Sequence, residues 1–167
     1  VLLQTYIEAQ ARKHGQRGIL QMRVVAISGF FNPIHMGHID YISSARNLGD
    51  FLIVIVNSDK QVEIKGSVPF MKQDERLSII NNIKGVDRAV IAIDEDGSVC
   101  DTLREEFKRL QNDPFFDEMI FANGGDRKEG YVPESILEDE IGITMVYNIG
   151  GGKIQSSSEL IKNSQNF

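Results

Sequence analysis

Residues 51–57 read Phe-Leu-Ile-Val-Ile-Val-Asn, a continuous apolar run that is rich in branched side chains. A strand with one face in water alternates apolar and polar residues, whereas a strand inside a parallel sheet is covered on both faces. An uninterrupted apolar run of this length fits the second arrangement. Phe51–Asn57 therefore predicts a central strand of a parallel sheet with helices packed on both sides.

Similar short apolar runs recur along the chain, and helical patterns separate them. Residues 58–71, which contain Gly66 and Pro69, are expected to form a longer connection. Together with Phe51–Asn57, the predicted strands are Arg23–Ser28, Arg88–Ile93, Glu118–Ala122 and Thr144–Asn148. The predicted helices are His35–Asn47, Gln73–Ile83, Ser98–Leu110, Pro133–Glu140 and Ser157–Asn163.

This alternation predicts an α/β fold, a doubly wound parallel sheet of five strands with helices on both faces. Sheets of this kind bind ligands outside the carboxyl ends of their strands. The loops after the first, second, fourth and fifth strands are therefore expected to carry the chemistry.

A length of 167 residues suits one domain with one core. We expect this domain to span residues 22–167, preceded by a polar N-terminal helical extension in residues 1–21, with helix from Leu3 to about Lys13. The extension could be a dimerisation helix, a cap on the sheet edge or the end of an upstream domain. The last possibility is open because position 1 is not Met.

Charge and cysteine content narrow the classes of function. The net charge of −6 argues against a protein that coats nucleic acid, although a small anionic ligand needs only a few local cations and backbone amides. Cys100 is the only cysteine, so an internal disulfide is excluded, and we expect an ordinary core or helix residue there. No apolar stretch approaches the length of a membrane span, and we expect a cytoplasmic protein without membrane contact.

The segment Gly29–His38, Gly-Phe-Phe-Asn-Pro-Ile-His-Met-Gly-His, carries the strongest chemical signal. It follows the first predicted strand and opens the first helix, so His35 and His38 share one face of the first turn. The backbone amides and the positive end of the helix dipole point toward the same face as the two imidazoles. Amides and imidazoles together could therefore hold a phosphate. Gly37 leaves room for a ribose or base. The alternative is that both histidines only pack against or cap the helix.

The His-Met-Gly-His block resembles the signature of the nucleotidyltransferase superfamily that includes the class I aminoacyl-tRNA synthetases. The segments around it are similar to the cytidylyltransferase-like family, above all to the heptose 1-phosphate adenylyltransferase module and then to glycerol 3-phosphate cytidylyltransferase. The resemblance covers roughly Arg23 to Lys162 and implies a Rossmann-like fold. It is carried by residues 41–59, Lys65-Gly66, Glu75-Arg76, Val86-Asp87, Asn123–Arg127 and Ile154–Leu160.

The resemblance implies transfer of CMP or AMP from CTP or ATP to a sugar or polyol phosphate, with release of pyrophosphate. His35, His38 and Lys65 would be catalytic, because they would contact the phosphates and stabilise charge at the α-phosphorus. Acceptor binding would fall to Asn57, Asp59 and Arg76. The nucleotide would be bound by Gly29, Phe30, Phe31, Asn32, Gly37, Gly124, Gly125, Asp126, Lys153, Ser156, Ser157 and Ser158.

An ionised acceptor phosphate needs no general base, because its second pKa is about 6. Mg²⁺ would arrive on the nucleoside triphosphate, and no residue is assigned as a protein ligand to the metal. Ser156 and Glu159 also have the spacing of a capping box, which is compatible with anion binding. We expect small-molecule substrates, no nucleic acid and a possible homodimer.

Three positions depart from the relatives that the sequence resembles. Lys153 stands near the place of an Arg that many relatives carry, and it cannot make the planar two-pronged contact of Arg. Asn123 replaces a Lys of the heptose-type module, and Asn32 replaces an Asp that is common in the first loop. Phe31–His35 is instead similar to pyridine-mononucleotide adenylyltransferases, which is the second interpretation. The third is a nucleotide-binding regulatory module without catalysis.

Overall fold

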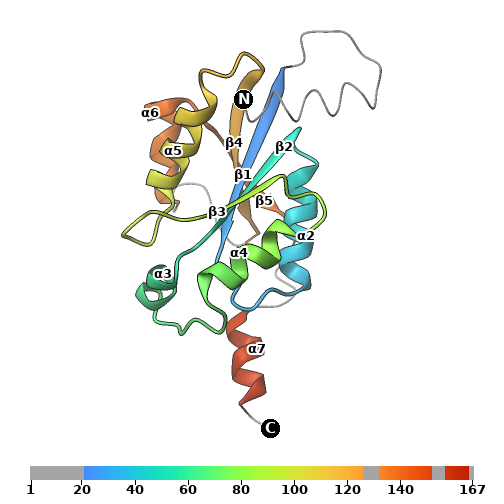
Figure 1. Ribbon diagram of the computed structural model, residues 1–167, viewed down its shortest axis with the longest axis vertical. Coiled ribbons are helices and arrows are strands. Elements are labelled where there is room, and N and C mark those ends of the chain that lie inside the picture. Colours follow the sequence, from blue (N-terminus) through green and yellow to red (C-terminus); the bar gives the residue numbers. More distant parts are fainter. Residues whose placement is uncertain (1–20, 126–131, 152–156, 166–167) are drawn as a thin grey trace.

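The sheet predicted from the apolar runs is present in the computed structural model, which describes residues 21–125, 132–151 and 157–165. Five parallel strands lie in the order β3-β2-β1-β4-β5 (Figure 1). The predicted helix between Leu3 and Lys13 lies outside the described residues. The strands are β1 (Met22–Gly29), β2 (Phe51–Val56), β3 (Arg88–Ile91), β4 (Phe116–Gly124) and β5 (Thr144–Ile149).

This strand order places β1 in the middle of the sheet. The chain runs from β1 outward through β2 to β3, and then returns to the other side of β1 for β4 and β5. The order therefore reverses between β1 and β4, and the loops after these two strands diverge there. Such a reversal is where doubly wound sheets form their ligand crevice.

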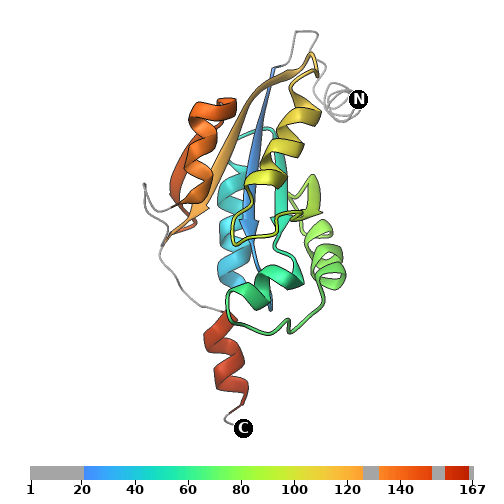
Figure 2. The same cartoon turned by 90° about the vertical axis from the view of Figure 1, so that its left-hand side faces the viewer.

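Two layers of helices cover the sheet, as the continuous apolar strands require (Figures 1 and 2). Along β2, Ile53 and Ile55 belong to one buried cluster, while Leu52 and Val54 belong to the other. The first face is covered by α5 (Cys100–Leu110) and by α6 (Ile136–Ile141), which follows a short 3₁₀ turn (Pro133–Ser135). The second face is covered by α2 (Met36–Arg46) and α4 (Gln73–Asn81). The doubly wound fold class is confirmed.

The connection after β2 contains a helix that the sequence analysis did not predict. Within residues 58–71, α3 spans Asp59–Ile64. The Ser58 hydroxyl accepts from the backbone N–H of Gln61, and the Gln61 side chain accepts from the backbone N–H of Ser58. This reciprocal pair is a capping box, and the Ser-x-x-Gln spacing is its sequence signal.

Gln61 ties α3 to the rest of the fold, since its side chain is almost completely buried. Its Nε2 donates to the carbonyl oxygens of Asp96 at 2.8 Å and Ser98 at 2.7 Å, in the loop after β3. Its Oε1 also accepts from Asn57 Nδ2 at 2.9 Å. The short helix is therefore held at a defined distance from the sheet.

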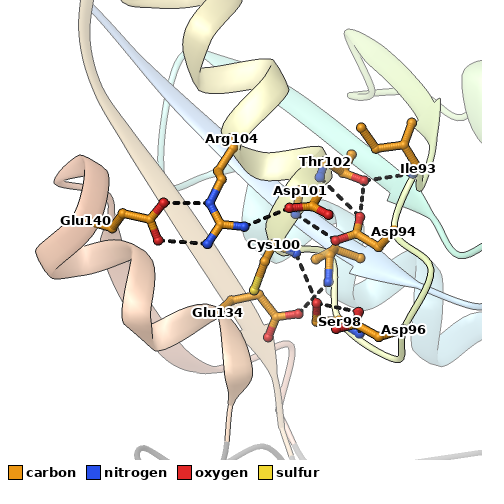
Figure 3. A network of polar contacts seen from close by, with 11 residues as sticks. Ile93, Asp94, Asp96, Ser98, Cys100, Asp101, Thr102, Arg104, Glu134 and Glu140 are labelled. Carbon is orange, nitrogen blue, oxygen red and sulfur yellow. Dashed lines mark hydrogen bonds and ion pairs between the residues drawn. The ribbon is translucent and has the colours of Figure 1, made fainter.

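The loop after β3 is itself fixed by a polar network (Figure 3). The buried Asp94 carboxylate accepts from the backbone N–H groups of Asp101 and Thr102 and from the Thr102 hydroxyl, which caps α5. Arg104 on α5 makes a two-pronged ion pair with Glu140 on α6, both contacts at 2.7 Å. These contacts keep α5 and α6 together on one face of the sheet.

Cys100 is the first residue of α5 and is half-buried. Burial raises the pKa of its thiol, so the nucleophilic thiolate is disfavoured. The expectation of an ordinary helix residue agrees with this position.

The last helix, α7 (Ser157–Ser164), lies beyond the carboxyl end of the sheet, outside both layers (Figure 2). Within the described ranges, none of the helices has the length and apolar character needed to cross a lipid bilayer.

The anchoring of α3 can be tested by replacing Gln61 with Ala. Four hydrogen bonds would be lost, and the buried partners would be left without water to replace them. We expect the free energy of unfolding to fall by about 2 kcal/mol in urea denaturation. Gln111→Ala is the matched control, because Gln111 is exposed at the end of α5, and its effect should stay within about 0.5 kcal/mol. Equal effects of the two changes would contradict the anchoring role.

Candidate active site

Two loops meet at the carboxyl ends of β1 and β2. The first, residues 30–35, leads from β1 to the start of α2, and the second contains α3 and residues 65–72. Hydrogen bonds from Asn32 and Arg76, and a contact between Lys65 and Phe30, join the two loops. The predicted catalytic residues His35, His38 and Lys65 all lie in this region.

His35 and His38 form an interlocked cap at the start of α2. His35 Nδ1 accepts from the backbone N–H of Gly37 at 3.1 Å, and His38 Nδ1 accepts from the backbone N–H of His35 at 3.2 Å. The rings stack with their centroids 3.9 Å apart. The two histidines therefore do cap the helix, and the same geometry presents both rings as one unit.

This cap determines which atoms of the rings remain for a ligand. An imidazole nitrogen that accepts from an N–H carries no proton, so each neutral ring holds its proton on Nε2. Burial, together with nearby His35 and Lys65, lowers the pKa of His38 from 6.5 to about 4. Burial also lowers the pKa of His35. At neutral pH both rings are therefore neutral donors through Nε2–H.

Phe31 and Gly29 support this pair from beneath. The Phe31 ring is buried and meets His38 edge to face, with the ring centroids 4.9 Å apart. A Cβ at Gly29 would lie 2.8 Å from Phe31 Cζ, so only glycine leaves space for the ring. The buried Phe31 ring thus packs against His38, and its predicted contact with the nucleotide stays a prediction.

Lys65 is exposed at the end of α3, and its Nζ lies 4.3 Å from the centroid of the Phe30 ring. A cation over an aromatic face is attracted by the ring quadrupole. The structure thus brings Lys65 from the second loop to the first one, beside the helix start that carries the histidines. Phe30 contacts this lysine, and its predicted contact with the nucleotide stays a prediction.

Arg76, which was predicted to bind the acceptor, makes its described contacts within the protein. Its side chain is fully buried, and its guanidinium donates to the carbonyl oxygens of Phe30 and Asn57, both at 2.7 Å, and of Met71 at 3.0 Å. It also makes an ion pair with Asp59 at 2.6 Å. Four of the five N–H groups of an arginine are thereby engaged within the protein. Arg76 therefore joins the ends of β1 and β2, and its predicted contact with the acceptor phosphate stays a prediction.

The other two predicted acceptor residues lie beside Arg76. Asn57 is buried, and its side-chain amide donates to Gln61. The predicted contact of Asn57 with an acceptor stays a prediction. The Asp59 side chain is 31% exposed and binds Arg76 through one oxygen. Its contact with an acceptor stays a prediction.

Asn32 is also buried, with 4% of its surface exposed. Its amide bonds to the backbone of residues 68–71, in the segment that follows Lys65. Asn32 therefore connects the two loops, and its predicted contact with the nucleotide stays a prediction.

The ends of β4 and β5 approach one another closely. A Cβ at Gly125 would lie 2.3 Å from the carbonyl oxygen of Gly151, so a larger residue would collide with backbone. Gly124 faces the ring of Tyr41, whose hydroxyl donates to the Ala122 carbonyl oxygen. Gly124 and Gly125 thus permit close packing at the reversal of strand order, where a nucleotide is expected.

Asn123 precedes these glycines and is almost completely buried. Its Nδ2 lies 3.4 Å from the Val146 carbonyl oxygen, and its Oδ1 is buried without a hydrogen-bond partner among the described residues. An uncharged side chain therefore occupies the position at which the heptose-type module carries Lys.

Several predicted nucleotide contacts lie where the structure gives no description. Asp126, Lys153 and Ser156 are outside the described residues, and so are the side chains of Ser157 and Ser158, although these two serines open α7. Their roles stay predictions. Sequence reasoning missed Gln61 and Tyr41, of which only Gln61 had a local signal, its capping-box spacing.

In the part of the chain that the structure describes, no three His, Cys, Asp or Glu side chains are grouped to hold a metal ion. The donors around the histidine pair are N–H groups and a lysine, which suit phosphate oxygens and not a cation. A magnesium ion that enters with the triphosphate stays a prediction.

The lowered pKa of His38 gives the stability a pH dependence. Unfolding restores the ordinary pKa of 6.5, so between about 4 and 6.5 the unfolded state binds more protons than the folded state. The free energy of unfolding should therefore fall as the pH drops through this range. His38→Asn removes the contribution, while its Oδ1 can replace Nδ1 as the acceptor. Urea denaturation between pH 4 and 7 should show a flatter slope for the variant, and parallel slopes would contradict the assignment.

Comparisons with known proteins show which family the sequence resembles. FAD synthase of Thermoplasma acidophilum is 39% identical over 75 residues, which cover 45% of this chain and 52% of that protein. FAD synthase of Thermoplasma volcanium is 35% identical over 100 residues, which cover 58% and 68%. The bifunctional protein HldE of Citrobacter koseri is 34% identical over 127 residues, which cover 71% of this chain and 25% of that protein. The match thus spans about half of the first relative and a quarter of HldE.

A solved structure and a family pattern extend the comparison. The crystal structure of the lipopolysaccharide core biosynthesis protein from Thermoplasma volcanium GSS1 is 30% identical with a TM-score of 0.57, and the match covers 79% of this chain and 99% of that one. The pattern of the family described as cytidylyltransferase-like matches residues 26–140, which include the histidine pair, Lys65 and Arg76. The chain therefore belongs to the cytidylyltransferase-like family of nucleotidyltransferases.

Proposed function

We propose that this nucleotidyltransferase transfers AMP or CMP from the nucleoside triphosphate to the phosphate of a small phosphorylated acceptor. The observation that carries the proposal is the stacked histidine pair at the start of α2. Both Nδ1 atoms are occupied by backbone N–H groups, so the two Nε2–H groups remain as paired donors at a helix N-terminus. Such an arrangement suits the oxygens of a polyphosphate.

The reaction needs alignment and charge stabilisation more than proton transfer. An acceptor phosphate oxygen attacks the α-phosphorus, a phosphoanhydride bond forms, and the bond to the β-phosphate breaks to release pyrophosphate. The imidazole N–H groups and the start of α2 would stabilise charge on the α- and β-phosphates. Lys65 would approach from α3 and neutralise charge between acceptor and donor. Mg²⁺ would enter with the triphosphate and supply further charge neutralisation.

ATP is the donor that we propose to test first. FAD contains an AMP half, so the FAD synthases among the relatives are consistent with adenylyl transfer onto a phosphate. The proposed acceptor is a sugar or polyol phosphate, with FMN as a second compound to test because of the same relatives. A pyridine mononucleotide as acceptor and a binding module without catalysis are outcomes that the experiments below separate.

The donor can be identified from thermal unfolding in Mg²⁺ alone, with Mg·ATP and with Mg·CTP. Ligand at about 100 times its dissociation constant adds roughly 2.7 kcal/mol of stability. For a chain of this size we expect a rise in Tm of roughly 5 to 10 °C with the true donor. A Tm shift with ATP, without pyrophosphate release for any acceptor tested, would favour the binding module. The absence of a shift with either nucleotide would contradict the proposal.

The role of the imidazoles can be tested with two substitutions of His38. Asn places its amide near Nδ1 and can keep the helix cap but lacks a donor at the Nε2 position. Gln extends an N–H donor toward the Nε2 position. We expect His38→Asn to lower kcat by about 100-fold to 1000-fold with a small change in Tm at pH 7.5, and His38→Gln to retain more of the activity.

Pyrophosphate release under saturating donor and acceptor is the readout for both variants. Full activity of His38→Asn would contradict a catalytic role for Nε2–H. Equal losses in both variants, accompanied by a large fall in Tm, would show that His38 is needed only for the cap.

A further inference from the structure

The segment between α3 and α4, residues 65–72, crosses the loop that follows β1. Asn32 in that loop makes three hydrogen bonds to the backbone of this segment. Its Nδ2 donates to the Val68 carbonyl oxygen at 2.9 Å, and its Oδ1 accepts from the N–H groups of Phe70 at 2.6 Å and Met71 at 3.2 Å. The buried Asn32 side chain thus accepts from two backbone N–H groups of the segment and donates to one of its carbonyl oxygens.

Two large apolar side chains of the segment contribute little burial at this crossing. Val68 is 76% exposed and Phe70 is 65% exposed. Backbone hydrogen bonds to Asn32 therefore contribute much of the contact that holds residues 68–71 to the first loop. Because Asn32 is 4% exposed, water does not compete for these bonds.

The pattern of bonds requires an amide. Asparagine offers N–H groups on one side and an oxygen on the other, whereas an ionised aspartate only accepts. Aspartate could still accept from Phe70 and Met71, but its second oxygen would lie against the Val68 carbonyl oxygen. The structure thus gives a physical reason for Asn at a position where Asp is common among relatives.

Lys65 lies at the start of this segment, and each end of the segment is linked to Phe30, one directly and the other through Arg76. Lys65 Nζ stands over the Phe30 ring, while Met71 is joined through Arg76 to the Phe30 carbonyl oxygen. Asn32 binds the middle of the same segment. If these bonds were lost, the chain between Lys65 and Met71 would be free to move away from the histidine pair.

We propose that Asn32 is a positioning residue that acts through Lys65: it fixes residues 68–71 so that the lysine is held beside the start of α2. The inference rests on the proposed function, because it assigns Lys65 a place in the reaction. Misplacing a catalytic group by about 1 Å can cost about 100-fold in rate. Asn32 therefore affects catalysis without touching the substrate.

The test is Asn32→Asp, with Asn82→Asp as the matched control. Asn82 also donates from Nδ2 to a backbone carbonyl oxygen, that of Ser78 at 2.8 Å, but it is exposed at the end of α4. We expect faster amide hydrogen exchange at Phe70 and Met71 and a fall in kcat of about 10-fold to 100-fold in Asn32→Asp. The control should change neither quantity by more than about twofold. Asn32→Ser gives a second, uncharged variant if the carboxylate prevents folding.

A double-mutant cycle with Lys65→Ala separates positioning from a general structural role. If Asn32 acts through Lys65, Asn32→Asp should cost less than threefold in kcat once Lys65 is absent. Losses that multiply in the double variant would overturn the proposal. Faster exchange with unchanged kcat would also overturn it, and the proposed function would stand. Wild-type protein that releases no pyrophosphate with any acceptor would overturn the proposed function itself, and the catalytic role of Asn32 with it.

Discussion

The buried guanidinium of Arg76 is the contact on which the geometry of the candidate site depends. It donates to the carbonyl oxygens of Phe30 and Asn57, where β1 and β2 end, and to Met71, just before α4. Its charge is balanced by Asp59 on α3. A buried charge is tolerated only when its donors are satisfied and a counter-charge is near. The two loops must therefore keep the positions that complete this set of partners.

In the proposed reaction, the histidine pair would bind phosphate through neutral N–H dipoles and not through full positive charges. Both imidazoles accept backbone N–H groups, and burial keeps His38 neutral at physiological pH. The free N–H groups and the start of α2 add partial positive charge without the cost of burying a cation. Lys65, whose Nζ lies over the Phe30 ring, is exposed, so its contact with a phosphate would cost little desolvation.

The fold and the centre of the site could be predicted because their signals are local. Phe51–Val56 alternates between two buried clusters, as a strand covered on both faces must, and the two histidines lie at the start of α2. Arg76 was assigned to the acceptor by resemblance, and its burial could not be foreseen because its partners lie up to 46 residues away. The short helix α3 had a signal in Ser58 and Gln61, but a six-residue helix is stabilised mainly by its tertiary contacts.

By itself, the sequence determined the alternation of the five strands with the longer helices, the position of the histidines at a helix start, and the spacing that lets them cap each other. These properties follow from backbone periodicity over a few residues. Only the tertiary structure decided that Asn32 and Arg76 face inward, that Gly29 makes room for Phe31, and that Lys65 reaches Phe30. These properties depend on which distant backbone groups lack partners once the sheet has formed, and residue spacing carries no record of that.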